Sequence, residues 1–200
     1  MRKMLAAAML AVAAVVGWQL STLIDGTSVA ERAAGPVPQA APSAVPIGRF
    51  QPTDPPRPAP GLTVIDGDGR RMDLADFRGK AVLLNLWATW CGPCVKEMPA
   101  LDRLQSTLGG RDFEVVAVSQ DRGGRNIVAP FFEKEKLSAL PMYLDPQGGA
   151  MAAFKPRGLP TSILIDRNGD EIGRIEGDAH WDGEEAAGMI RRLIERPAAG

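Results

Sequence analysis

Cys91 and Cys94 are the two cysteines of this 200-residue chain, and Gly92 and Pro93 separate them. Two thiols at this spacing can form a reversible disulfide, in which one thiolate attacks a disulfide of another molecule and the second thiol resolves the mixed disulfide. Pro93 suits the first turn of a helix, and a helix N-terminus stabilises a thiolate. We therefore predict that Cys91 is the attacking nucleophile and that Cys94 is the resolving thiol.

Two structural interpretations of the cysteine pair are weaker. A structural zinc site usually needs four ligands, and the one histidine of the chain, His180, is the remaining candidate of the usual soft kind. A structural disulfide that closes so short a loop would constrain the unfolded chain little. A C-x-x-C pair next to a strand–helix pattern is instead typical of a thioredoxin-like redox site.

The elements that must position the thiols can be read on both sides of the pair. Residues 81–87 form an almost continuous apolar run, which predicts a strand buried on both faces of a sheet. After the pair, apolar residues recur at helical spacing, which predicts a helix up to about residue 108. These residues are Met98, Leu101, Leu104 and Leu108. The thiols therefore lie where a buried strand turns into a helix.

Residues 84–99, LNLWATWCGPCVKEMP, resemble the TlpA/ResA branch of the thioredoxin superfamily, whose members are membrane-anchored, extracytoplasmic thiol–disulfide oxidoreductases. The stretch DFRGK at residues 76–80 also matches that branch, and the resemblance covers about residues 61–195. It implies an α/β thioredoxin fold, with a central mixed sheet flanked by helices and an N-terminal β-hairpin extension.

The remaining pattern agrees with this fold. It predicts a hairpin of short strands at 62–66 and 71–74, strands at 113–119 and 142–144, helices at 126–137, 150–154 and 182–195, and a hairpin of strands at 162–166 and 171–176. Strands that alternate with helices and end in an antiparallel hairpin indicate a mixed sheet between helices.

Glu97 is the candidate acid–base group. It lies about one helical turn beyond Cys94 on the same side, where a partly buried carboxyl could exchange a proton with that thiol. Thioredoxin itself carries an aspartate where this chain has Asn85, and an amide cannot ionise. By resemblance, the glutamate at this spacing lines the active-site cavity. We expect Glu97 to act in catalysis together with Cys91 and Cys94.

The predicted substrate-binding residues surround the thiols. By resemblance, Pro160 is a cis-proline that faces the cysteines and exposes the backbone of Leu159 to a substrate segment. Trp90 would form a partly exposed wall beside the nucleophile. Gly92 and Pro93 complete this set.

The N-terminal sequence predicts the cellular compartment of the protein. Arg2 and Lys3 precede a mostly apolar segment up to residue 24, which is long enough for a membrane anchor with the rest of the chain outside the cytoplasm. A cleaved signal peptide is the alternative. Residues 25–60 read as a Pro/Ala-rich linker without a core, because nine of the 17 prolines lie there. Residues 61–200 would form the thioredoxin-like domain.

These features predict a single-pass protein of the inner membrane with a periplasmic reductase domain. Its partners would be protein disulfides and a membrane electron donor, and the resemblance suggests cytochrome c maturation or copper-site assembly of cytochrome oxidase. We expect no metal and no cofactor beyond the redox-active disulfide Cys91–Cys94. A formal net charge of −1 gives no case for nucleic acid. A thiol oxidant or isomerase, and a copper(I)-binding metallochaperone, stay open as alternatives.

Overall fold

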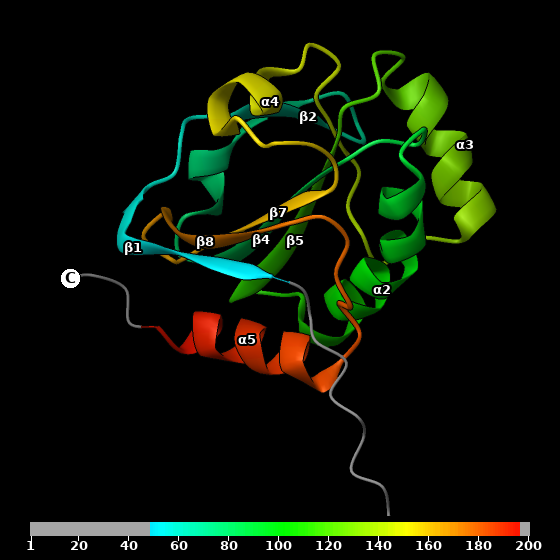
Figure 1. Ribbon diagram of the computed structural model, residues 1–200. Helices are drawn as coiled ribbons and strands as arrows, with labels where there is room; N and C mark the ends of the chain where they lie inside the picture. Colours follow the sequence, from blue (N-terminus) through cyan, green and yellow to red (C-terminus); the bar gives the residue numbers. More distant parts are fainter. Residues whose placement is uncertain (1–48, 197–200) are drawn as a thin grey trace, which may run out of the picture. The chain divides into compact units, whose positions relative to one another are not determined.

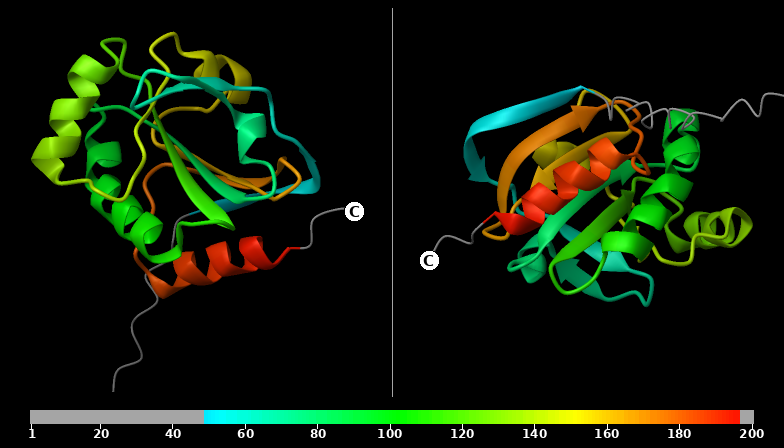
Figure 2. Two further views of the ribbon diagram at one scale, coloured as in Figure 1. Left: turned by 180° about the vertical axis from the view of Figure 1, so that it is seen from behind. Right: turned by 90° about the horizontal axis from the view of Figure 1, so that it is seen from below.

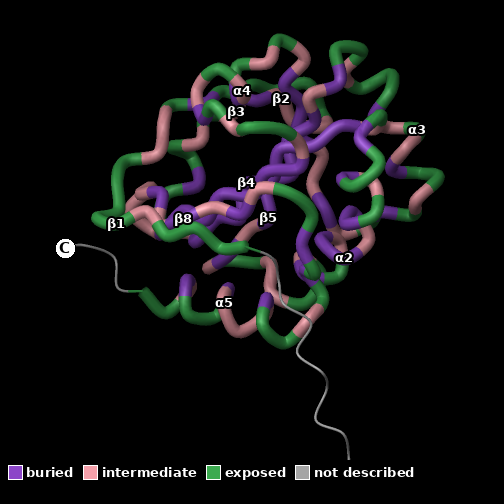
Figure 3. The backbone as a smooth tube through the Cα atoms, viewed as in Figure 1, coloured by how far each residue is buried: buried purple, intermediate pink, exposed green. Residues whose placement is uncertain are grey.

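Strand β4 (Ala81–Trp87) is buried along its whole length. Its sequence, AVLLNLW, offers one polar side chain, so both faces of the strand require cover from other elements. The computed structural model describes residues 49–196 (Figure 1). Figure 3 shows the buried residues concentrated on the central strands, with the helices and the outer strand partly exposed.

The neighbours of β4 determine what lies beside the predicted active turn. Strand β4 pairs in parallel with β5 (Phe113–Ser119) and antiparallel with β7 (Thr161–Ile165). The second pairing places Asn85 opposite Ser162. The other strands are β1 (Phe50–Pro58), β2 (Thr63–Asp66), β3 (Arg71–Asp73), β6 (Tyr143–Leu144) and β8 (Asp170–Glu176). Within the described residues, the eight strands form one mixed sheet in the order β1-β8-β7-β4-β5-β6-β2-β3.

Helices cover both faces of this sheet (Figures 1 and 2). They are α2 (Gly92–Leu108), α3 (Arg125–Glu135), α4 (Gly149–Phe154), α5 (Glu184–Glu195) and the 3₁₀ turn η1 (Leu74–Phe77). Side chains of α2, α3 and α5 share one hydrophobic cluster with Trp87 and Phe113. Side chains of η1 and α4 share a second cluster with Leu84 and Leu86. The sheet therefore has a core on each face.

From residue 61 onward the predicted elements are confirmed, with ends that differ by one or two residues. Strand 113–119 is β5, the hairpin at 162–176 is β7 and β8, and the N-terminal hairpin is β2 paired with β3. The architecture is the thioredoxin-like mixed sheet between helices that the sequence predicted.

The linker prediction is wrong for residues 50–58. These residues form the edge strand β1, which pairs antiparallel with β8. Proline is tolerated there because one side of an edge strand needs no N–H donors. Arg57 and Thr53 also bond to the buried carboxylate of Glu171. Gly173 leaves room for the ring of Phe50, since a Cβ there would lie 2.3 Å from it. Backbone pairing and these contacts hold a segment that lacks an apolar face.

No helix within residues 49–196 combines the length and apolar character needed to cross a membrane. The predicted anchor at residues 1–24 and most of the predicted linker lie outside the described residues.

Candidate active site

Cys91 and Cys94 lie at the junction of β4 and α2 and form a disulfide. Cys91 is the N-cap residue of the helix, and its Sγ accepts a hydrogen bond of 3.3 Å from the backbone N–H of Cys94. Cys91 has 6% of its surface exposed to solvent, whereas Cys94 is fully buried. A partner sulfur can therefore approach Cys91 and not Cys94, as the assigned roles require.

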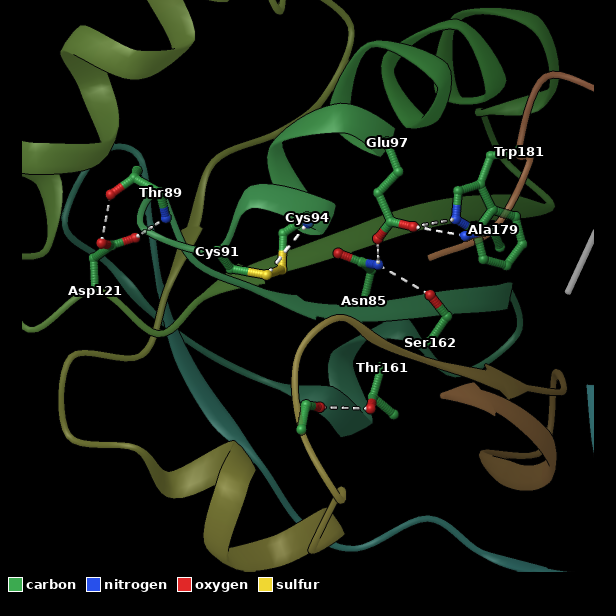
Figure 4. Close-up of a disulfide and its surroundings, with 11 residues drawn as sticks. Asn85, Thr89, Cys91, Cys94, Glu97, Asp121, Thr161, Ser162, Ala179 and Trp181 are labelled. Carbon is green, nitrogen blue, oxygen red and sulfur yellow. Dashed lines mark hydrogen bonds between the residues drawn. A yellow bond between two sulfur atoms is a disulfide. The ribbon is translucent and has the colours of Figure 1, made fainter. Parts of the chain in front are cut away.

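Glu97 lies one turn farther along α2, with 3% of its surface exposed. Its Oε1 accepts a hydrogen bond of 2.7 Å from Asn85 Nδ2. Its Oε2 accepts two bonds of 3.2 Å, from the backbone N–H of Ala179 and from Trp181 Nε1 (Figure 4). The loop between β8 and α5 therefore closes over the carboxyl group and shields it from water.

Burial raises the pKa of Glu97 from 4.5 to about 7. The three hydrogen bonds favour the charged form and limit this rise in pKa, and the nearby charge of Asp178 adds to it. A carboxyl group with a pKa close to neutral can both accept and release a proton under physiological conditions. This property matches the acid–base role predicted for Glu97.

Asn85 connects the carboxyl group to the opposite strand. Its Nδ2 donates to Ser162 Oγ at 2.9 Å as well as to Glu97. Its Oδ1 is buried and has no hydrogen-bond partner among the described residues. In Figure 4 this oxygen points toward Cys94. A free acceptor thus faces Cys94, beside the carboxyl group of Glu97.

The segment before β7 forms the opposite wall of the site. The Leu159–Pro160 peptide bond is cis, as predicted. Thr161 Oγ1 donates to the carbonyl oxygen of Gly158 at 2.8 Å and holds this turn. Gly158 and Leu159 line a pocket of about 520 Å³ together with Cys91.

The other predicted binding residues also surround the nucleophile. Trp90 lines the same pocket and is 71% exposed, the largest fraction among the exposed large hydrophobic residues of the described chain. Gly92 and Pro93 are exposed at the start of α2. The structure therefore brings Trp90 and Leu159 together around Cys91, and their binding roles stay predictions.

Asp121 is a site residue that the sequence reading missed. Its buried carboxylate accepts hydrogen bonds from Thr89 N at 2.9 Å, Thr89 Oγ1 at 2.7 Å and Ser119 Oγ at 2.8 Å (Figure 4). Asp121 follows the end of β5, and the turn before Cys91 follows the end of β4. Because parallel strands end at the same edge of a sheet, an acidic residue two positions after β5 was a signal for this contact.

Ala179 and Trp181 were also not assigned to the site. Both lie in the loop before α5, more than 80 positions after Glu97 in the chain. Their contact depends on the packing of that loop against α2, and no local pattern indicates it. The described residues contain no group of three or more His, Cys, Asp or Glu side chains that could hold a metal ion.

Comparisons with known proteins agree with this geometry. The family model of AhpC/TSA matches residues 55–170. The thiol-disulfide oxidoreductase ResA of Bacillus thuringiensis subsp. konkukian is 37% identical over 120 residues, which are 60% of this chain and 68% of that protein. ResA of a Bacillus cereus strain is 34% identical over 135 residues, or 68% and 76% of the two chains.

A solved structure of a thiol:disulfide interchange protein is also similar to this chain. The crystal structure of a thiol:disulfide interchange protein described as DsbE, from Chlorobium tepidum, superimposes with a TM-score of 0.62 and 30% identity. The match covers 70% of this chain and 96% of that one. The family match includes the strand, both cysteines and the glutamate that form the site.

Proposed function

This chain belongs to the AhpC/TSA family of thioredoxin-like proteins and is a thiol–disulfide oxidoreductase of the ResA type, and we propose that it works in the reducing direction on disulfides of partner proteins. The Cys-Gly-Pro-Cys sequence supports the reducing direction, and one structural observation supports the exchange chemistry itself: the two sulfurs differ in access. Cys91 lines a pocket at the surface, and Cys94 lies fully buried behind it. Cys91 can contact a partner protein, whereas Cys94 can react only with Cys91, from the interior of the domain.

The reaction begins with the thiolate of Cys91. It attacks one sulfur of a partner disulfide, the partner's S–S bond breaks, and the second partner sulfur leaves as a thiolate. The thiolate of Cys94 then attacks Sγ of Cys91 and releases the first partner sulfur. The partner gains two electrons and two protons, and Cys91 and Cys94 end as the disulfide found in this structure.

Glu97 supplies the acid–base step. Cys94 must lose its proton before it can attack, and its buried position disfavours a free thiolate. The carboxylate of Glu97 accepts this proton, directly or through a water molecule. Its pKa of about 7 allows it to be charged when the proton must leave and neutral afterwards. Asn85 holds the carboxyl group in place through its bond to Oε1.

The sequence between the cysteines favours the reducing direction. Cys-Gly-Pro-Cys is the motif of strongly reducing thioredoxin, whose reduction potential is about −270 mV. After each turnover the disulfide must be reduced again, and we assign this to a dithiol donor in the membrane. Proteins of cytochrome c maturation or of cytochrome oxidase copper-site assembly are the proposed substrates.

The location follows from the N-terminal sequence. Residues 1–24 would anchor the chain in the inner membrane, and the segment up to β1 would connect this anchor to the catalytic domain on the periplasmic side. In such an oxidising space, a reductase needs a dedicated donor.

The thiol state in intact cells tests the proposed direction. Acid quenching followed by alkylation would separate reduced from oxidised protein. Mostly reduced Cys91 and Cys94 are expected, and deletion of the membrane donor should make them oxidised. Mostly oxidised cysteines in unperturbed cells would contradict the reductase assignment and favour the thiol oxidant.

A further inference from the structure

The pocket beside Cys91 is large enough to hold side chains of a partner. Its volume is about 520 Å³, and apolar atoms form most of its wall. The lining residues are Trp90, Cys91, Gln120, Arg122, Pro146, Gln147, Gly148, Met151, Gly158 and Leu159. Here we call this set the Cys91 groove. Any segment that delivers a disulfide to Cys91 must lie in it or along it.

Arg122 is the one charged side chain among these lining residues. It is exposed, and within residues 49–196 no carboxylate lies within ion-pair distance of it. The two nearby acidic residues face inward: Asp121 bonds to Thr89 and Ser119, and Asp145 accepts the backbone N–H groups at the start of α4. Arg122 therefore places in the Cys91 groove a cation that forms no ion pair with a carboxylate of the described residues.

Gln120 lines the Cys91 groove and carries a buried oxygen without a hydrogen-bond donor. Its Nε2 donates to the carbonyl oxygen of Val118 at 3.4 Å, which leaves Oε1 as the free end of the amide. This Oε1 is buried and has no hydrogen-bond partner among the described residues. A buried acceptor without a donor costs free energy, and such groups are usually paired. Because Oε1 is buried, an N–H group of a partner reaches it once the Gln120 side chain turns toward the groove.

We infer that the Cys91 groove binds an extended partner segment with an acidic side chain next to its disulfide-bonded cysteine. The carboxylate pairs with Arg122, and an apolar side chain packs against Trp90 and Leu159. An N–H group of the segment donates to Gln120 Oε1 after the Gln120 side chain turns toward the groove. This inference rests on the proposed function and specifies its substrate. A segment with lysine in the same place would meet Arg122 as a like charge.

Charge reversal of both partners tests the inference. Two disulfide-bonded peptides would be used that differ in one residue, Glu or Lys, directly after the attacked cysteine. The reduced protein is expected to reduce the Glu peptide with a kcat/KM about fivefold higher, the size of a favourable exposed ion pair. Arg122→Glu should reverse this preference. Arg191→Glu, which makes the same charge change on α5 outside the groove, should leave it unchanged.

Gln120→Leu tests the second contact. It removes the acceptor without changing charge, so KM should rise for both peptides while their ratio stays the same. Equal kcat/KM for the two peptides, or a preference that survives Arg122→Glu, would overturn the inference and leave the proposed function intact. If the wild-type protein reduced neither peptide, the proposed function would fail as well.

Discussion

Asn85 Nδ2 donates a hydrogen bond of 2.7 Å to Glu97 Oε1, and both side chains are buried. The bond joins the strand before the cysteines to the helix after them. It holds a buried carboxyl group one helical turn beyond Cys94, while the free oxygen of the same amide points toward that cysteine (Figure 4). The proposed proton transfer in the resolving step would therefore involve an amide and a carboxyl group that form one hydrogen-bonded unit.

The pH dependence of the resolving step should follow Glu97. In single-turnover reactions of the reduced protein with a disulfide peptide, the rate of resolution should rise through pH 7, because the pKa of Glu97 lies at about 7 and its charged form accepts the proton. Glu97→Gln should lower this rate about 100-fold at pH 7. The remaining rate should rise only toward the pKa of a free thiol, about 8.5.

A second variant separates this effect from attack by Cys91. In the Cys94→Ala background the reaction stops at the mixed disulfide, so its rate reports the first step alone. Glu97→Gln should change that rate little. An equal loss in both steps would assign Glu97 a structural role instead of the proposed proton transfer.

The stability of the oxidised protein should fall as pH rises from about 4.5 to 7. In this range the unfolded chain has lost the proton of Glu97, whereas the folded protein retains it because burial raises the pKa to about 7. The folded state therefore binds more protons than the unfolded state. The free energy of unfolding is highest below the pKa of Glu97 in the unfolded chain, and it falls as the pH approaches the pKa of Glu97 in the folded protein. The contribution is on the order of 3 kcal/mol.

Glu97→Gln should remove this dependence. The free energy of unfolding, measured by denaturant titration at several pH values, should rise for the variant relative to the wild type between pH 5 and 8. A constant difference across that range would mean that Glu97 titrates normally. Any effect of the Gln side chain itself on the free energy of unfolding is the same at every pH. The pH dependence of the difference therefore reports the titration of Glu97 alone.

Trp181 should tune the pKa of Glu97. Its Nε1 donates to Oε2 at 3.2 Å, and this bond favours the charged carboxylate. Trp181→Phe removes the donor, so the pKa should move above its wild-type value. The side-chain ¹³C shift of Glu97 would report the midpoint. Trp90→Phe serves as the control, since Trp90 makes no hydrogen bond to Glu97, and a lower midpoint in Trp181→Phe would contradict the account.

Asp121 should stabilise the turn before Cys91. Asp121→Ala leaves Thr89 N, Thr89 Oγ1 and Ser119 Oγ without their acceptor, and we expect a loss of about 2–4 kcal/mol in the free energy of unfolding. Asp112→Ala is the matched control, because Asp112 is partly exposed and its ion pair with Arg167 should contribute less than about 1 kcal/mol. Similar losses in the two variants would show that Asp121 has no special role.

Local pattern was enough to predict the parts of the site that lie close together in the chain. The apolar run before Cys91, the helical spacing after it and the position of Glu97 each follow from a few neighbouring residues. The identity of Pro160 as a cis-proline came from resemblance, and the structure confirms it.

The rest of the site depends on contacts between distant segments. Trp181 reaches Glu97 only because the loop before α5 packs on α2, and Asp121 reaches Thr89 because β4 and β5 end side by side. The segment 50–58 looked like a linker because its pattern has no apolar face, yet backbone pairing to β8 orders it. An apolar composition predicts burial, but composition does not predict an edge strand that is ordered by backbone hydrogen bonds to its neighbour.

The division of labour between the two sulfurs is tested most directly by trapping. Reduced Cys94→Ala and Cys91→Ala variants would each be mixed with a disulfide-bonded peptide, and the adducts mapped by mass spectrometry. Cys94→Ala should accumulate a mixed disulfide on Cys91, because no thiol remains to resolve it, whereas Cys91→Ala should form none, because Cys94 is fully buried. An adduct on Cys94, or none on Cys91, would contradict the account.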